Sequence, residues 1–128
     1  MDAATRGFVR LRANHRCEYC QFRQQDSETP HHIEHIIARK HGGADHDSNL
    51  ALACNRCNLH KASNLSGIDP LTGELVRLYH PRQDRWHEHF AWEAEKIIGI
   101  SAIGRATVRV LALNHSRRLE LRVSAPNE

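Results

Sequence analysis

The sequence predicts an α+β fold built on a short two-stranded hairpin followed by a helix. The first observation is two C-x-x-C pairs, Cys17/Cys20 and Cys54/Cys57, which are separated by 33 residues. The second is the pattern between them: the apolar runs HHIEHII and LALAC flank the Gly-rich loop KHGGADHDSN, and NRCNLHKAS then begins like a helix. A chain of 128 residues is long enough for one domain with a modest core.

The cysteine pairs predict a structural zinc site. Each C-x-x-C forms a tight knuckle with both sulfurs on one side, so Cys17, Cys20, Cys54 and Cys57 can give four thiolates to one tetrahedral zinc. Two disulfides or a redox pair are the alternatives, but a redox C-x-x-C normally occurs singly and disulfides suit exported proteins. Four cysteines close the coordination sphere, so this zinc has no position for water or substrate.

The remaining elements follow in chain order. The basic stretch TRGFVRLRANHR predicts a short helix, and GIDPLTGE predicts a turn. We expect strands at LVRLYHP, DRWHEHFAW and KIIGIS. The spacing of GRATVRVLALNHSRRLELRVS favours helix, broken near Asn114 as an N-cap, although its valines keep strand as an alternative. We expect this C-terminal half to pack onto the same core.

Charge and hydropathy limit the partners. The formal charge of +3 and the pI of about 8.9 permit a nucleic-acid partner without requiring one. No apolar run approaches the ~18 residues that span a bilayer, and the N-terminus lacks the apolar centre of a signal peptide. We therefore expect a soluble cytoplasmic protein without a membrane partner, and the sequence predicts no particular oligomeric state.

Polar side chains between and beside the cysteine pairs form a candidate second site. Glu34 and His35 lie in the first expected strand, Asn49 precedes the second, and Asn58 directly follows the last cysteine. Carboxylate and amide oxygens are hard ligands that suit Mg²⁺ or Mn²⁺, and an imidazole can act as a base near neutral pH. Neighbours on a regular strand point to opposite faces. Glu34 and His35 can therefore share a site only if the strand ends or bends there, or if the ion lies beside its edge. His32 would share a face with Glu34 and is a weaker candidate ligand.

At this point the sequence resembles a known family. CEYC, IEHI, HGG, NLALACNRCN and HK resemble, in order and approximate spacing, the HNH endonucleases of the subgroup with two zinc knuckles. The resemblance covers about residues 10–66, and GIDPLTGELVRLYHPRQDRWHEHFAW with GRATV is similar to the tail of small bacterial and phage HNH proteins. It implies a ββα-metal (His-Me finger) core within a single domain at 1–128, with a C-terminal extension of strands and helices at about 67–128.

The resemblance also implies roles for individual residues. His35 matches the general base, Glu34 the acidic metal ligand, which is more often aspartate, and Asn49 the residue that holds the loop and orients the base. Asn58 stands where many members have the last histidine, which gives an H-N-N pattern and favours one Mg²⁺ or Mn²⁺ as the catalytic ion. His60 is an alternative ligand, and Lys61 matches a basic residue that is a candidate phosphate contact. The implied activity is hydrolysis of phosphodiester bonds in DNA, most simply double-stranded, leaving 5′-phosphates.

A second function class stays open. A non-catalytic zinc module that binds nucleic acid or protein would use the same scaffold, and the cysteines support both readings equally. Glu34, His35 and Asn58 favour the enzyme, because a binding module needs no hard-metal ligands beside a free imidazole. Two groups of arginines are read either as a DNA-facing surface or as solvated side chains: Arg6, Arg10, Arg12 and Arg16, and Arg117, Arg118 and Arg122. His31 is expected to be solvated.

Overall fold

The computed structural model, which describes residues 1–125, contains the predicted hairpin between the cysteine pairs and the predicted helix at the second pair. Strand β1 (His32–His35) pairs antiparallel with β2 (Leu50–Ala53), with Glu34 opposite Ala51. Helix α2 (Asn55–Lys61) follows directly. Its N-cap is Cys54, whose sulfur accepts a hydrogen bond from the backbone of Cys57 at 3.4 Å. The second cysteine pair therefore starts the helix.

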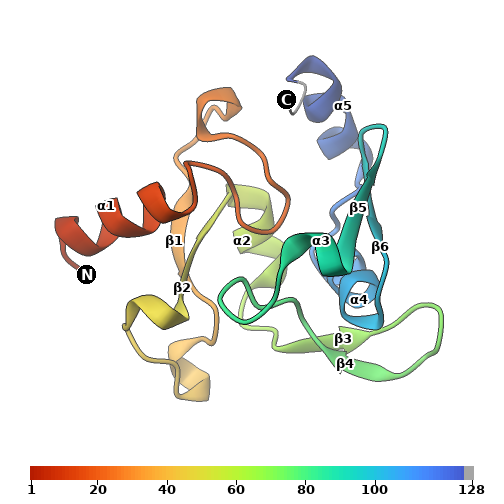
Figure 1. Ribbon diagram of the computed structural model, residues 1–128, viewed down its shortest axis with the longest axis horizontal. Helices are drawn as coiled ribbons and strands as arrows, with labels where there is room; N and C mark the ends of the chain where they lie inside the picture. The colour runs from red at the N-terminus through yellow and green to blue at the C-terminus, as the bar shows by residue number, and fades with distance from the viewer. Residues whose placement is uncertain (126–128) are drawn as a thin grey trace.

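Short helices and two further two-stranded antiparallel sheets make up the rest of the described fold (Figure 1). Sheet β1–β2 is followed by β3–β4 and β5–β6, each a local hairpin. The predicted α+β class is confirmed. The remaining elements are α1 (Ala3–Arg12), β3 (Ser66–Ile68), β4 (Leu75–Arg77), α3 (Trp86–His89), β5 (Phe90–Glu93), β6 (Lys96–Gly99), α4 (Ala102–Val110) and α5 (Ser116–Ser124).

The strand expected at DRWHEHFAW is wrong in its first half. Residues Trp86–His89 form the short helix α3, and the strand starts only at Phe90. The helical turn brings the rings of Trp86 and Phe90 to 5.1 Å, because residues four apart lie on one side of a helix. The indole Nε1 of Trp86 also donates to the carbonyl of Tyr19 at 2.8 Å. Tertiary packing of Trp86 therefore decides the local structure. In addition, the segment read as a turn contributes β3 at its start.

The C-terminal segment is helical, as favoured, and the strand alternative is wrong. It divides into α4 and α5, and the break lies near Asn114 as predicted. The N-cap of α5 is His115, however, and Asn114 has another role. Its side chain accepts from the backbone N–H of Ile97 at 2.9 Å and donates to the carbonyl of Ile97 at 2.8 Å. The side-chain amide of Asn114 thus makes the pair of hydrogen bonds that a neighbouring strand would make with Ile97, and it links this turn to β6.

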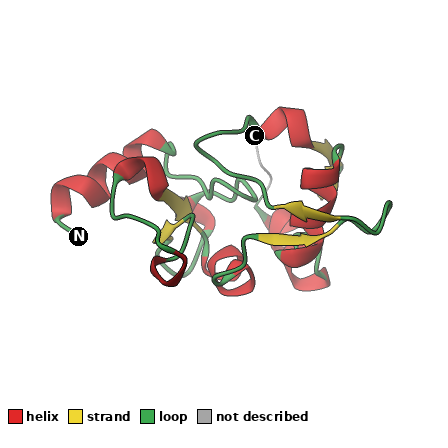
Figure 2. Cartoon of the chain, turned by 90° about the horizontal axis from the view of Figure 1, so that it is seen from below, coloured by secondary structure: helices red, strands yellow, loops and turns green. Residues whose placement is uncertain are grey.

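The core draws on both halves of the chain. One cluster of buried residues contains the four cysteines together with Tyr19, Ala51, Leu78, Tyr79, Trp86, Phe90, Ile97 and Leu113. A smaller cluster lies under α1 and includes Val9, Leu50 and Leu52. Alternate residues of β2 therefore face different neighbours, which is why the whole strand is buried. Figure 2 shows α1 at one end of the molecule and hairpin β3–β4 at the other. No helix within the described residues has the length and apolar character needed to cross a membrane.

Two glycines allow α4 to approach β6 and the end of α3 closely. A Cβ added to Gly104 would lie 1.9 Å from the backbone oxygen of His89, and one added to Gly99 would lie 2.4 Å from the backbone nitrogen of Arg105. Backbone atoms cannot give way as a flexible side chain can. The glycine of GRATV is therefore a packing requirement of this fold.

We expect Gly104→Ala to lower the free energy of unfolding by about 3 kcal/mol, because the methyl group forces backbone apart in a packed core. Gly7 in the middle of α1 is the matched control, since a Cβ there would meet nothing within 4 Å. Gly7→Ala should raise stability by up to about 1 kcal/mol through helix propensity. Urea unfolding of both variants measures the contrast. Equal shifts of the same sign would contradict the packing explanation.

Candidate active site

The four cysteines form a buried cluster that fits one zinc ion. The sulfurs of Cys17, Cys20, Cys54 and Cys57 lie within 4.8 Å of one another, and none is in a disulfide. The sulfurs of Cys20 and Cys54 are 3.7 Å apart. Tetrahedral zinc with Zn–S bonds of about 2.3 Å requires sulfurs about 3.8 Å apart. Within residues 1–125, this is the one group of three or more His, Cys, Asp and Glu ligand atoms that lie close together. The predicted cysteine cluster is confirmed.

Local backbone geometry builds the first knuckle. The chain turns back on itself after Cys20, where Gln21 adopts a positive φ of 69° and donates its backbone N–H to the carbonyl of Cys17. The Cys17 N–H in turn donates to the carbonyl of Phe22 at 2.9 Å. The Cys20 N–H points to the Cys17 sulfur at 3.5 Å. Backbone amides are thus directed at sulfurs in both pairs, which favours their thiolate forms.

Burial and hydrogen bonds among the sulfurs shift the pKa values of the four thiols in different directions. Burial raises the pKa of Cys17 and Cys57. Hydrogen bonds among the sulfurs, led by Cys17, lower the pKa of Cys20 and Cys54. Packing alone therefore does not ionise all four groups. Zinc binding requires the remaining protons to leave, so metal uptake at this site is coupled to proton release.

An open hollow of about 430 Å³ brings together three of the residues singled out in the sequence. It runs along β1, whose outer edge is free because β1 pairs only with β2. Three consecutive strand residues contribute to it, so both faces of the strand reach the hollow at this edge. The strand needs no bend between Glu34 and His35, since its register is regular and it ends at His35. The lining residues are Ile33, Glu34, His35, Ala38, Arg39, Asn58, Ala62 and Ser63.

His35 has a carboxylate partner that sequence reasoning missed. Its Nε2 lies 2.6 Å from Oδ1 of Asp45, which also accepts from Arg39 at 3.0 Å. The hydrogen bond from His35, followed by those from Arg39, holds the pKa of Asp45 below its ordinary value. The signal in the sequence is an aspartate just after the Gly-Gly pair. A Cβ on Gly43 would lie 1.7 Å from the carbonyl oxygen of Ile37, so glycine there allows the loop to fold back toward His35.

Asn49 closes this loop at both ends. Its Oδ1 accepts from the N–H of Ile37 at 2.9 Å, and its Nδ2 donates to the carbonyls of Ile37 at 3.0 Å and Ala44 at 2.9 Å. Asn49 is buried, so these hydrogen bonds are shielded from water. One side chain thus joins the two ends of the loop, at Ile37 and at Ala44. This geometry suits the loop-holding role that the sequence predicts for Asn49.

Glu34 faces inward as well as lining the hollow. The hydroxyl of Tyr19 donates to its Oε1, and the Lys61 ammonium lies 3.5 Å from its Oε2. Burial raises the pKa of Glu34, while Lys61 and Tyr19 act in the opposite direction. Lys61 is only 2% exposed and also donates to the carbonyl of Ile36 at 2.7 Å. Lys61 is therefore not a solvated side chain, because its charge is buried against β1 and Glu34.

Three of the histidines lie away from this hollow. His32 is exposed, and its Nε2 lies 3.1 Å from Oδ1 of Asn55 in a separate depression. His60 is exposed and does not line the hollow. The structure thus does not bring His32 or His60 to Glu34. The expectation that His31 is solvated is wrong: it is 1% exposed, and its Nε2 lies 2.9 Å from the carbonyl oxygen of Phe22.

The predicted arginine groups do not form one surface. Arg118 and Arg122 of α5 are buried, so their reading as DNA-facing or solvated side chains is wrong. Arg12 donates to the carbonyls of Leu50 at 2.8 Å and Asp47 at 3.1 Å, which holds it against the hairpin. Arg6, Arg10 and Arg117 reach the surface at least in part. The fold thus separates structural arginines from those that face solvent.

Comparison with known proteins agrees with this geometry. Residues 17–64 match the family model described as HNH endonuclease. No significant match to a curated protein or to a solved structure was found. The matched segment contains both cysteine pairs and all of the residues discussed around the hollow. The family match and the clustered cysteine pairs together place residues 17–64 of this chain in the HNH endonuclease family.

Proposed function

We propose that this protein is a metal-dependent endonuclease that hydrolyses phosphodiester bonds of double-stranded DNA. The observation that carries the proposal is the hollow at the edge of β1, where His35 lies beside Glu34 and Asn58. A base and two hard oxygen ligands on one open surface are the groups that phosphodiester hydrolysis with one metal ion requires.

The donor set of the hollow fits one magnesium or manganese ion. Glu34 offers carboxylate oxygens, and Asn58 offers an amide oxygen from the α2 helix. Each carboxylate oxygen can accept more than one hydrogen bond or ligand, so the contacts with Tyr19 and Lys61 leave capacity for an ion. A bound divalent ion would supply positive charge to the phosphate and to the leaving 3′-oxygen.

His35 acts as the general base in this proposal, and Asp45 positions it. With Asp45 ionised, the imidazole donates from Nε2 to the carboxylate at 2.6 Å. The neutral ring then carries its lone pair on Nδ1, which accepts the proton of the attacking water. Asn49 fixes the loop that carries Asp45. Arg39 lines the hollow and offers a cation to the phosphate.

The rival proposal is a zinc-containing module that binds nucleic acid or protein without cleaving it. The cysteine cluster supports both proposals equally. The Asp45–His35 pair favours the enzyme, because orienting an imidazole at an open hollow serves proton transfer and adds little to a binding surface.

We expect His35→Ala to slow the nicking of supercoiled plasmid by about 10²- to 10⁴-fold, the usual contribution of a general base. The assay uses zinc-loaded protein with Mg²⁺ or Mn²⁺ and follows the relaxed and linear products on a gel. His41→Ala is the matched control, because His41 is exposed and lies outside the hollow. If wild-type protein never cleaves, or His35→Ala cleaves as fast as wild type, the proposed function or its base is wrong.

The roles of the structural zinc and of the catalytic Mg²⁺ or Mn²⁺ should be separable by experiment. Metal analysis of purified protein should find about one zinc per chain, because one closed four-cysteine site is present. Withholding Mg²⁺ and Mn²⁺ should stop cleavage while zinc content and far-UV circular dichroism stay unchanged. Removing zinc with a strong chelator should unfold the protein, since the metal joins distant segments. Recovery of disulfides without zinc, shown by thiol titration, would refute the zinc assignment.

A further inference from the structure

We propose that the DNA duplex enters the hollow along an adjoining basic groove, in which Arg6 and Arg10 contact its phosphates. This inference rests on the proposed function and adds the surface that holds the substrate. The groove has a volume of about 560 Å³ and shares one lining residue, Ile33, with the hollow. It lies between α1 and the start of β1, which are neighbours in Figure 1. Its lining residues are Met1, Arg6, Arg10, Thr29, Pro30, His31, His32, Ile33 and Asn55.

The charged side chains that line the groove are of one sign. None of its lining residues, all of which the structure describes, is acidic, whereas two are arginines. Arg10 donates from one guanidinium nitrogen to the carbonyl of His31 at 3.3 Å, which holds the side chain over the groove floor. Asp2, which precedes α1, accepts the hydrogen bond of the Thr5 N–H and serves as a helix cap. A polyanion is therefore the partner whose charge complements this groove.

Polar groups on the groove wall suit a nucleic-acid backbone. His32 and Asn55 form a hydrogen-bonded pair there, and amide and imidazole groups commonly bind phosphate and sugar oxygens. The buried Nδ1 of His31 has no hydrogen-bond partner within residues 1–125. His31 also lines the groove. Three other arginines of the two predicted groups do not line this groove: Arg12, Arg118 and Arg122.

The test measures binding separately from cleavage. Fluorescence anisotropy with a labelled DNA duplex, zinc-loaded protein and no added Mg²⁺ or Mn²⁺ gives the affinity at several salt concentrations. Wild type is compared with R6Q/R10Q and with the control R109Q/R117Q, which removes equal charge from exposed positions on α4 and α5. We expect R6Q/R10Q to reduce the slope of log affinity against log salt by about 1.8, at about 0.9 for each phosphate contact. The control should leave the slope unchanged.

The outcomes are distinct. Equal slopes for both double variants, an unchanged slope for R6Q/R10Q, or no binding of duplex by wild type would overturn the groove. Circular dichroism confirms that the variants are folded, and the single variants R6Q and R10Q, each expected to remove about 0.9 from the slope, replace the double variant if it is not. Wild-type binding through the groove without any plasmid nicking would defeat the proposed function but leave the groove standing. Plasmid nicking by wild type, together with unchanged DNA binding by R6Q/R10Q, would defeat the groove but leave the proposed function standing.

A different observation carries a second inference: the structure assigns Arg118 as the residue that couples the zinc site to helix α5. One guanidinium nitrogen lies 2.9 Å from the Cys57 sulfur and 3.7 Å from the Cys54 sulfur, and the other donates to the carbonyl of Leu111 at 2.7 Å. Arg118 is 4% exposed and lies outside the segment that matches the HNH family. Zinc with four thiolates carries two net negative charges, and a buried cation beside it offsets part of that charge.

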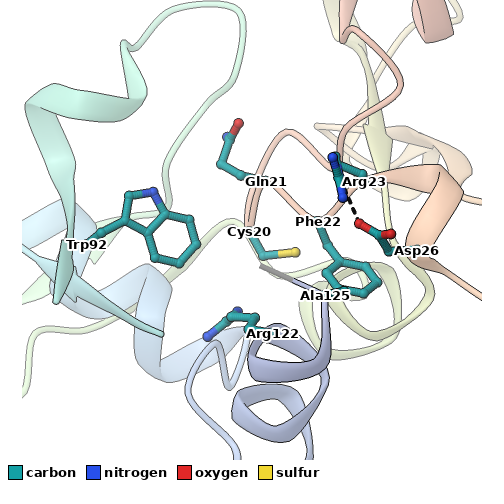
Figure 3. A pocket seen from close by; sticks show the side chains of 8 residues that line it. All are labelled: Cys20, Gln21, Phe22, Arg23, Asp26, Trp92, Arg122 and Ala125. Atoms are coloured by element: carbon teal, nitrogen blue, oxygen red, sulfur yellow. Dashed lines mark hydrogen bonds and ion pairs between the residues drawn. The ribbon is translucent and has the colours of Figure 1, made fainter. Parts of the chain in front are cut away.

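Arg122 lies one turn further along the same helix. Figure 3 shows its guanidinium below Cys20 and close to the Trp92 ring, and their separation is 5.9 Å to the ring centroid. It also donates to the carbonyl of Glu95 at 3.1 Å. Helix α5 thus brings two cations to the cysteine cluster from the end of the chain. The contacts of Arg118 that would offset the charge of a zinc–thiolate group also hold the C-terminal helix against the core.

The test is the rate of zinc release to an excess of a chromogenic chelator, which reports on the site independently of DNA cleavage. We expect Arg118→Met to release zinc about 10- to 100-fold faster than wild type, the usual effect of losing an outer partner of a metal ligand. Arg117→Met is the control, because Arg117 is exposed on the same helix and pairs with Glu120. Arg118→Lys keeps the positive charge but lacks the second guanidinium nitrogen, so it should release zinc at a rate between those of wild type and Arg118→Met. Wild-type release rates in the Met variant, or in the Lys variant where the Met variant does not fold, would overturn the coupling.

Discussion

Burial of four cysteine sulfurs in one cluster is the constraint on which the rest of this structure depends. The cluster joins the knuckle at Cys17 and Cys20 to the N-terminus of α2, on either side of the β1–β2 hairpin. Buried thiolates are costly unless a cation accompanies them. Arg118 brings one cation to the sulfurs from the C-terminal helix, and a zinc ion would supply the other at the centre of the cluster. The hairpin, the helix that follows it and the end of the chain therefore share one anchoring point.

The candidate active site lies at the free edge of strand β1, next to the cysteine cluster in sequence. His35 is the last residue of β1, and the loop beyond it returns to the strand because Asn49 binds both of its ends. On the inner side, Lys61 neutralises Glu34 in the interior. The two neighbours Glu34 and His35 therefore face different environments, one buried and one open, yet both reach the free edge of the strand. Neighbouring side chains on a strand point to opposite faces, and a site at the strand edge can be reached from both faces without a distorted backbone.

Much of the molecule could be predicted from local patterns. The short apolar runs and the Gly-Gly loop predicted the hairpin and the helix from residues close in sequence, and the repeated C-x-x-C spacing predicted the sulfur cluster although its two pairs lie 33 residues apart. Trp86 could not be placed in this way: its helix depends on a hydrogen bond to the carbonyl of Tyr19, far away in the chain. Asp45 was missed for a related reason, since its value lies in a 2.6 Å contact with His35 across a loop. The direction of an arginine side chain likewise depends on what packs against its helix.

The sequence by itself determined the residue types of both sites: four cysteines with zinc spacing, and a carboxylate, an imidazole and amides in the order of the HNH family. Only the tertiary structure decided which charged groups are structural and which remain open. Lys61, Arg118 and Arg122 are as basic as Arg6 and Arg10, yet the first three are buried against anions or carbonyls while the other two face a groove. The physical reason is that burial and pairing are properties of packed surfaces, and these surfaces form only when distant segments meet around the cysteine cluster.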